Sequence, residues 1–274
     1  MLKRVVTALV LAPLAMAAIW LLPTGGIAIL FAIVVGLGAL EWARLVGITR
    51  PLLQALYLLG LLLLLVVGWV FFRSTLAKEP VFLLATLWWL AALFLLRRFS
   101  RQSDITTAPP VGLNTVIGYV VLGLSWLAMV VLHGMVAGPY FVTLLLLLVW
   151  GADTGAYFAG RRFGRRKLAV RISPGKTWEG AIGGLLLALV AGIVLHLVLG
   201  PASPSLLMLV PIIVITVLFS IVGDLFESMI KRQHGAKDSG NLLPGHGGVL
   251  DRIDSLTAAA PIFVMGLLWL WMAP

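Results

Sequence analysis

The chain is a succession of long apolar runs separated by short breaks that carry Pro, Gly or charged residues. A helix that crosses a bilayer needs about 20 mostly apolar residues. The runs are too long and too continuous for the alternating strands of a membrane barrel. The sequence therefore predicts an all-α polytopic membrane protein with about nine transmembrane helices, at residues 4–22, 24–46, 52–72, 80–97, 113–135, 139–160, 178–199, 205–230 and 255–273.

Composition agrees with this fold class. The chain is 61% hydrophobic and 11% charged, whereas a soluble domain carries about 25% charged residues. Because the sequence contains no cysteine, disulfide and thiolate chemistry are excluded. The first apolar run is longer than the core of a signal peptide, which has about 7–15 residues. We therefore expect an uncleaved first helix.

The basic residues predict the topology. With the N-terminus in the cytoplasm, 18 of the 20 Lys and Arg residues fall in cytoplasmic segments, and only Arg73 and Lys78 fall outside. Positively charged residues concentrate on the cytoplasmic side of membrane proteins. We therefore expect a cytoplasmic N-terminus and an external C-terminus.

The acidic residues are concentrated in one part of the chain. Seven of the ten lie between residues 151 and 254, and Glu41, Glu79 and Asp104 are the others. This predicts an N-terminal hydrophobic scaffold (1–112) and a catalytic helical membrane domain (113–274) with charged cytoplasmic loops at 161–177 and 231–254. An ion-coupled transporter is the alternative, although the lopsided distribution differs from the paired broken helices of inverted repeats.

The first charged loop has several candidate features. Asp153 lies near a helix end and is either functional or paired with an Arg. The basic run from Arg161 to Lys167 can also simply meet anionic lipid. Gly180, Gly183 and Gly184 suit close helix packing.

Residues 173–177, with the sequence SPGKT, precede a predicted helix. Backbone N–H groups at a helix start and the charge of Lys176 favour phosphate binding by Ser173, Lys176 and Thr177. The segment is not a P-loop, because Val170 stands where that motif requires Gly. The alternative is a Ser or Thr helix cap that Glu179 supports.

The second loop combines helical and non-helical parts. Asp224, either Glu227 or Ser228, and Lys231 repeat at helical spacing and share one face. Residues 240–248 are rich in Gly and cannot form a regular helix, and these glycines allow close approach to a ligand. Asp251 and Asp254 share a face at the start of the last helix.

Three of these acids suit a hard cation. Mg²⁺ is commonly bound by one or two carboxylates together with substrate phosphates, which Asp224, Asp251 and Asp254 could supply. Asp254 could instead cap a helix that begins at Leu256. No HExxH motif or Cys cluster supports zinc, and a lone His246 is more often structural.

The stretch from Ser228 to Asp254 reads SMIKRQHGAKDSGNLLPGHGGVLDRID. It resembles, without a gap, the signature of phosphatidate cytidylyltransferases, also called CDP-diacylglycerol synthases. Residues 153–157 and 173–180 are similar to that family too. The resemblance implies a membrane enzyme, typical of the bacterial inner membrane, that joins CTP and phosphatidate into CDP-diacylglycerol and pyrophosphate for phospholipid synthesis. It implies Mg²⁺ as the cofactor and leaves a second cation open. A CDP-alcohol phosphotransferase would carry a D-G-x-x-A-R pattern, which is absent.

The resemblance and the residue chemistry together predict a site. The expected metal ligands are Asp224, Asp251 and Asp254, and the catalytic set adds Lys237 and Asp238 to these three. The expected substrate-binding residues are Ser173, Lys176, Thr177, Ser228, Lys231, Arg232, His246, Gly247, Gly248 and Arg252. The expected partners are CTP, phosphatidate and membrane lipid, with no nucleic acid, and Gly-rich helices allow a homodimer without requiring one.

Overall fold

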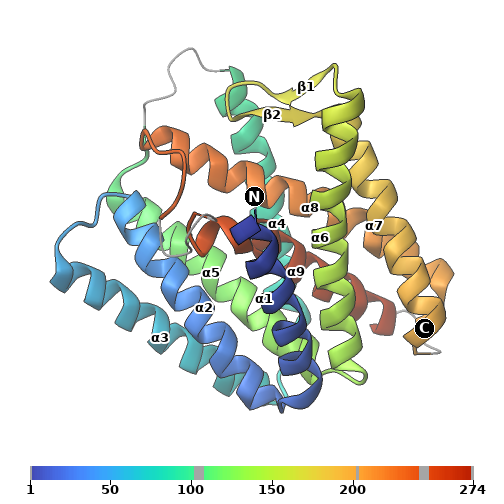
Figure 1. The fold of residues 1–274 in the computed structure, drawn as a ribbon. Helices are drawn as coiled ribbons and strands as arrows, with labels where there is room; N and C mark the ends of the chain where they lie inside the picture. Colours follow the sequence, from blue (N-terminus) through green and yellow to red (C-terminus); the bar gives the residue numbers. More distant parts are fainter. Residues whose placement is uncertain (1, 102–107, 202–203, 241–246, 273–274) are drawn as a thin grey trace. The chain divides into compact units, whose positions relative to one another are not determined.

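A computed structural model describes residues 2–101, 108–201, 204–240 and 247–272 (Figure 1). Within these residues the chain forms nine helices and two short strands. The helices are α1 (Leu2–Leu21), α2 (Thr24–Leu45), α3 (Pro51–Arg73), α4 (Glu79–Arg101), α5 (Val111–Gly134), α6 (Gly138–Phe163), α7 (Trp178–Leu199), α8 (Leu206–Gln233) and α9 (Leu250–Met272).

The helices confirm an all-α polytopic membrane protein. Among the described residues, α2 to α9 are each long and apolar enough to cross a membrane, and α1 contributes the shorter apolar segment Ala12–Leu21. The predicted spans match these helices closely except at α9, which begins at Leu250 rather than at residue 255. Hydropathy missed this start because the first turn of α9 is polar. The orientation across the membrane stays a prediction.

The chain divides into two compact units whose segments alternate along the sequence. The first unit comprises Met1–Leu76, Pro109–Thr143 and His234–Ile253. The second unit comprises Ala77–Ala108, Leu144–Gln233 and Asp254–Pro274. These units cut across the predicted boundary at residue 112, because the first unit includes α5 and the segment that leads into α9. The assignment of scaffold and catalytic roles to the two sequence halves stays a prediction.

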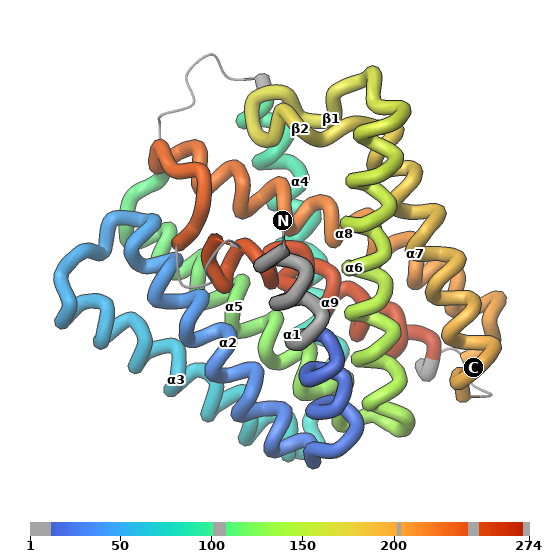
Figure 2. Tube along the Cα trace, in the orientation of Figure 1, coloured from blue at the N-terminus to red at the C-terminus, as the bar shows by residue number. Residues whose placement is uncertain are grey.

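In the first unit, α2, α3 and α5 pack against one another (Figure 2). Two buried indoles fasten the packing, because Trp42 Nε1 donates to the Asn114 carbonyl at 2.9 Å and Trp126 Nε1 donates to the Ala28 carbonyl at 2.8 Å. A buried Trp usually finds such an acceptor for its N–H. These bonds tie α2 to α5 at two levels.

In the second unit, α8 packs against both α4 and α7. Phe226 of α8 lies edge-on to Trp88 and Trp89 of α4, with ring centroids 6.0 and 5.7 Å apart. Helix α7 is different, since only 17% of its most apolar 18 residues are buried. Most of the apolar surface of α7 is therefore exposed rather than packed against other helices.

The charged connection between α6 and α7 contains structure that the sequence did not predict. Helix α6 continues to Phe163, and the chain then forms an antiparallel pair of strands, β1 (Lys167–Ala169) and β2 (Ser173–Thr177) (Figure 1). Ile172, in the turn between them, is 1% exposed. The pairing satisfies backbone groups of a polar segment, and the buried Ile172 anchors it.

Candidate functional site

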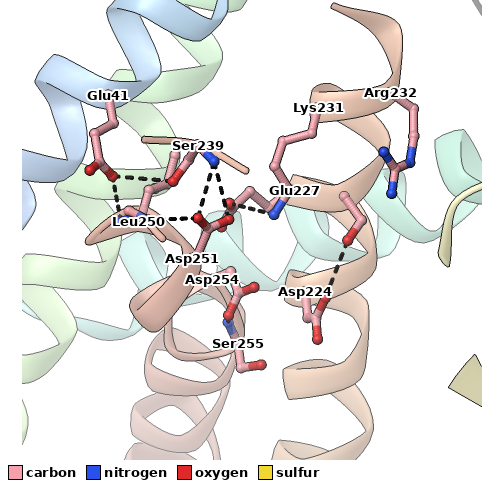
Figure 3. A network of polar contacts seen from close by, with 12 residues as sticks. Glu41, Asp224, Glu227, Lys231, Arg232, Ser239, Leu250, Asp251, Asp254 and Ser255 are labelled. Atoms are coloured by element: carbon pink, nitrogen blue, oxygen red, sulfur yellow. Dashed lines mark hydrogen bonds and ion pairs between the residues drawn. The ribbon is translucent and has the colours of Figure 1, made fainter. Parts of the chain in front are cut away.

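One face of α8 carries the acid, hydroxyl and base that helical spacing predicted. Lys231 Nζ lies 3.0 Å from Glu227 Oε1, and both side chains are buried. Ser228 Oγ donates to Asp224 Oδ1 at 3.4 Å (Figure 3). The predicted shared face is therefore confirmed, and it includes both Glu227 and Ser228.

Asp254 of α9 joins this group in the second unit. A Cβ added to Gly223 of α8 would lie 2.5 Å from the Asp254 carbonyl oxygen, so the two backbones nearly touch at this level. The carboxylates of Asp224 and Glu227 and the ammonium of Lys231 interact electrostatically with the Asp254 carboxylate. The carboxylates of three acids and the ammonium of Lys231 therefore lie close enough to one another to interact within the second unit.

Asp254 is not the helix cap considered from the sequence. That alternative is wrong because α9 already begins at Leu250. Asp254 Oδ1 accepts a hydrogen bond from the Ser255 backbone N–H at 2.6 Å. The predicted place of Asp251 and Asp254 at the start of the last helix is confirmed.

A cavity of about 240 Å³ opens beside Asp224 within the second unit. Its charged lining residues are Asp153, Lys176 and Asp224, and Thr177 and Ser255 add hydroxyl groups. Lys176 Nζ lies 2.5 Å from Asp224 Oδ2, and each side chain is about a quarter exposed, at 27% and 24%. A cation and an anion that remain accessible at a cavity are suited to exchange partners with a charged ligand.

Lys176 reaches this cavity from β2, whose C-terminal end is fixed by contacts at the start of α7. Thr177 is the N-cap of α7, and its Oγ1 accepts from Gly180 N at 3.1 Å. Glu179 accepts from the backbone N–H groups of Arg165 at 3.0 Å and Arg166 at 3.2 Å. The capping alternative is therefore confirmed for Thr177, whereas Glu179 holds the approach to β1 instead of completing a capping box.

Small residues let α6 and α7 approach each other along the cavity. A Cβ on Gly155 would lie 2.6 Å from the Gly183 carbonyl oxygen, and one on Gly183 would overlap the Ala159 side chain. A Cβ on Gly184 would lie 2.5 Å from the Ala152 carbonyl oxygen. The predicted close packing of these glycines is confirmed, and it brings Asp153 and β2 to the same cavity.

Asp251 has a separate set of contacts in the first unit. Its carboxylate accepts from the Ser239 backbone N–H at 3.1 Å and from the Gly248 backbone N–H at 2.8 Å (Figure 3). Gly247 has a φ of +81°, which only glycine adopts readily. The carboxylate of Asp251 thus organises the chain that leads into its own helix.

The glycines of this segment approach a protein group rather than a ligand. A Cβ on Gly240 would lie 2.5 Å from Glu41 Oε1, and one on Gly248 would overlap Glu41 Oε2 and Ser239 Oγ. For these two positions the predicted reason, close approach to a ligand, is replaced by close approach to Glu41. The sequence offered one signal for Glu41, namely a single carboxylate within an otherwise apolar run.

The other predicted site residues have different surroundings. Ser173 is partly buried in β2, and Arg232 Nε donates to the Ile172 carbonyl at 3.3 Å. Lys237, Asp238 and Arg252 are exposed in the first unit. His246 lies outside the described residues. The structure therefore brings Asp224, Asp254, Ser228, Lys231, Lys176 and Thr177 into one unit, and places Asp251, Gly247 and Gly248 in the other.

The donor set of the second unit suits a divalent cation that also binds phosphate. Among the described residues, no group of three or more His, Asp and Glu side chains is arranged to hold an ion unaided. Mg²⁺ commonly needs only one or two carboxylates when substrate phosphates complete its shell. Asp224 and Asp254 provide two such carboxylates, so their chemistry fits this mode.

Comparison with known proteins gives consistent matches along the chain. The model of the cytidylyltransferase family matches residues 2–270. A phosphatidate cytidylyltransferase of Pseudomonas aeruginosa is 44% identical over 274 residues, which cover 99% of each chain. That of Haemophilus influenzae is 36% identical, covering 95% of this chain and 96% of the relative. That of Brucella suis is 37% identical, covering 96% and 91%. The transporter alternative receives no support from these relatives.

Proposed function

Because this chain belongs to the cytidylyltransferase family, we propose that it converts CTP and phosphatidate into CDP-diacylglycerol and pyrophosphate. The cavity where Lys176 and Asp224 meet is the structural observation that carries the proposal. Phosphatidate is held in the bilayer by its acyl chains, and an enzyme that spans the membrane gives its phosphate a path to such a site. We place the protein in a bacterial inner membrane, with both charged segments on the cytoplasmic side.

The reaction needs positioning more than proton transfer. A phosphatidate oxygen, already anionic near neutral pH, attacks the α-phosphorus of CTP and forms a new P–O bond. The bond between the α-phosphorus and its bridging oxygen breaks, and pyrophosphate leaves with that electron pair. Phosphoryl transfers of this kind rest mainly on alignment and on stabilisation of charge, so no strong general base is required.

The ion pair at the cavity provides a way to couple substrate binding to site assembly. Lys176 is the cation that a phosphate entering the cavity would meet, and it is a point charge suited to that contact. When Lys176 turns to the phosphate, Asp224 is released for a cation. Asp224 and Asp254 would then hold Mg²⁺, with Asp251 as the third ligand predicted from the sequence. The ion, when bound, would offset negative charge on the phosphate oxygens.

The buried pair on α8 supports this arrangement. Lys231 Nζ lies 3.0 Å from Glu227 Oε1 and neutralises that carboxylate, and both side chains interact electrostatically with the Asp254 carboxylate. The pair limits the net negative charge beside Asp254 before substrate arrives. Ser228 keeps Asp224 oriented through its hydroxyl. The substrate contacts of Ser173, Arg232, His246, Gly247 and Arg252, and the catalytic roles of Lys237 and Asp238, are proposed from the sequence resemblance alone. Gly248 is left out of this set, because its close neighbour is Glu41.

The test is cytidylyl transfer by the purified full chain in detergent micelles that contain phosphatidate. We expect CDP-diacylglycerol and pyrophosphate in equal amounts with CTP and Mg²⁺, no product after EDTA, and much slower reaction with ATP, GTP or UTP. Folded, monodisperse protein that makes no CDP-diacylglycerol in several lipid mixtures would refute the proposal.

Matched variants connect the activity to the cavity. Lys176→Ala and Arg165→Ala each remove one basic side chain from the same connection, but only Lys176 lines the cavity. We expect Lys176→Ala to raise the KM for CTP at least tenfold, and Arg165→Ala to leave it within twofold. Equal effects of the two variants would show that the connection acts through its overall charge instead.

A further inference from the structure

Glu41 is a buried carboxylate in α2 with an unusual set of partners. Its side chain is 1% exposed, and it accepts three hydrogen bonds. Ser239 Oγ donates to Oε2 at 3.2 Å, Leu250 N donates to Oε2 at 2.8 Å and Val249 N donates to Oε1 at 3.0 Å (Figure 3). All of these groups belong to the first unit. Glu41 thus fastens two parts of the signature segment (residues 228–254), one at Ser239 and one at the start of α9.

The same backbone also holds Asp251. Ser239 donates its hydroxyl to Glu41 and its backbone N–H to Asp251, so one residue bridges the two acids. At the start of α9, Gly248 N donates to Asp251, whereas Val249 N and Leu250 N donate to Glu41. The position of the Asp251 carboxylate is therefore set by the backbone that Glu41 keeps in place.

The two glycines that flank this contact make room for Glu41. Any side chain at Gly240 or Gly248 would meet one of its carboxylate oxygens, as described above. The signature segment therefore contains glycine at two positions because an acid from another helix occupies the adjacent space. This relation links α2 to the signature segment independently of hydrogen bonding.

The chemistry of the pocket requires a carboxylate. Burying a charged group is costly unless it is paired or hydrogen-bonded, and here every neighbour named is a donor. The N-terminal N–H groups of a helix also favour negative charge. An amide in place of the carboxylate would turn an NH₂ group toward the N–H of Val249 or Leu250, since Gln has a single acceptor oxygen.

We propose that Glu41 is a positioning residue for the reaction. It holds Ser239 and the start of α9, so that the Asp251 carboxylate has the position and orientation that the transfer requires. This inference rests on the proposed function, because it assigns Asp251 a part in the transfer. Residues that orient a ligating or reacting carboxylate typically contribute about 10- to 100-fold in activity when removed.

The main experiment compares Glu41→Gln with Glu79→Gln in the purified full chain. Glu79 is the control acid, because it lies partly exposed at the first turn of α4 in the second unit. For Glu41→Gln we expect kcat to fall about 10- to 100-fold, with the KM for CTP changed less than threefold. Hydrogen–deuterium exchange should become faster in a peptide that covers Val249 and Leu250. Glu79→Gln should match the wild type in both measurements.

A second route to the same contact is to fill the space beside Glu41. Gly240→Ala should lower kcat and accelerate exchange as Glu41→Gln does, whereas Gly112→Ala, with no atom within 4 Å of the added Cβ, should do neither. Because both changes act on one contact, the double variant should be no worse than the poorer single variant. If Glu41→Gln does not fold, Glu41→Asp and Gly240→Ala provide the same readouts.

Several results would overturn the inference. Normal kcat in folded Glu41→Gln, or lower thermal stability with unchanged kcat, would leave Glu41 a purely structural residue. Unchanged exchange at Val249 and Leu250, or additive effects in the double variant, would also contradict it. Absence of cytidylyl transfer by the wild type would instead defeat the proposed function, and the exchange measurement would still judge the contact.

Discussion

Gly223→Ala tests whether the close approach of α8 and α9 aligns the acids of the second unit. The added Cβ would lie 2.5 Å from the Asp254 carbonyl oxygen, 3.1 Å from Ala258 Cβ and 3.4 Å from Ser255 Cα. Real Cβ atoms essentially never lie within 3.0 Å of such an atom, so the two backbones must separate locally by at least 0.5 Å. The displaced atom is backbone, so rotation of a side chain cannot relieve the contact.

The magnitude follows from two opposing effects. Overpacking costs about 1–3 kcal/mol, whereas Gly→Ala inside a helix gains up to about 1 kcal/mol in helix propensity. We therefore expect a net loss of about 0–2 kcal/mol in stability. A misplacement of about 1 Å can cost about 100-fold in rate, so a shift of half that size should lower kcat about 10-fold.

The assay is kcat for CDP-diacylglycerol formation together with thermal unfolding in detergent. Gly36→Ala is the matched control, because Gly36 is also buried in a helix but its added Cβ would lie 3.5 Å from Leu58 Cδ1, an ordinary contact. Gly36→Ala should keep the wild-type kcat. Wild-type turnover in Gly223→Ala, or an equal loss in Gly36→Ala, would refute the reasoning.

Two further predictions concern the ion pairs and the helix cap. Lys231→Met should destabilise the protein by about 3–5 kcal/mol, because it leaves buried Glu227 uncompensated; Lys176→Met should cost only about 0–1 kcal/mol, since its pair with Asp224 is partly exposed. Thermal unfolding of both variants checks this, and equal losses would contradict it. Thr177→Ala should cost about 1 kcal/mol through loss of the N-cap of α7, while Thr177→Ser should retain most of it. Unfolding of the pair tests this, and similar losses in both would argue against capping by the hydroxyl.

The sequence predicted features that depend on local pattern. Apolar runs of membrane-spanning length fixed the helices, and the spacing of Asp224, Ser228 and Lys231 fixed their common face. Hydropathy placed the start of α9 five residues late, because a polar helical turn such as Asp251-Arg252 looks like a loop in an apolar pattern. Hydropathy also missed the two strands between α6 and α7, because their pairing depends on backbone groups and on the buried side chain of Ile172.

Contacts over long sequence separation were beyond the reach of the sequence. Glu41 lies 198 residues from Ser239 and 209 from Leu250, and no periodicity connects positions so far apart. The sequence showed that the signature is rich in glycine, but it did not show that Glu41 is the neighbour of Gly240 and Gly248. The pairing of Lys176 with Asp224 was hidden for the same reason, since each residue looked like a separate ligand for substrate or metal.

The poorly covered surface of α7 has a consequence for how the protein responds to its membrane. Only 17% of the most apolar part of α7 is buried, and Lys176 stands two residues before its first residue, Trp178. A transmembrane helix whose hydrophobic length differs from the bilayer thickness tilts, or the bilayer deforms around it. We therefore expect bilayer thickness to change the tilt of α7 and, with it, the position of Lys176 relative to the lipid headgroups. Acyl-chain length would then influence the enzyme through the surrounding bilayer, apart from its role in the substrate.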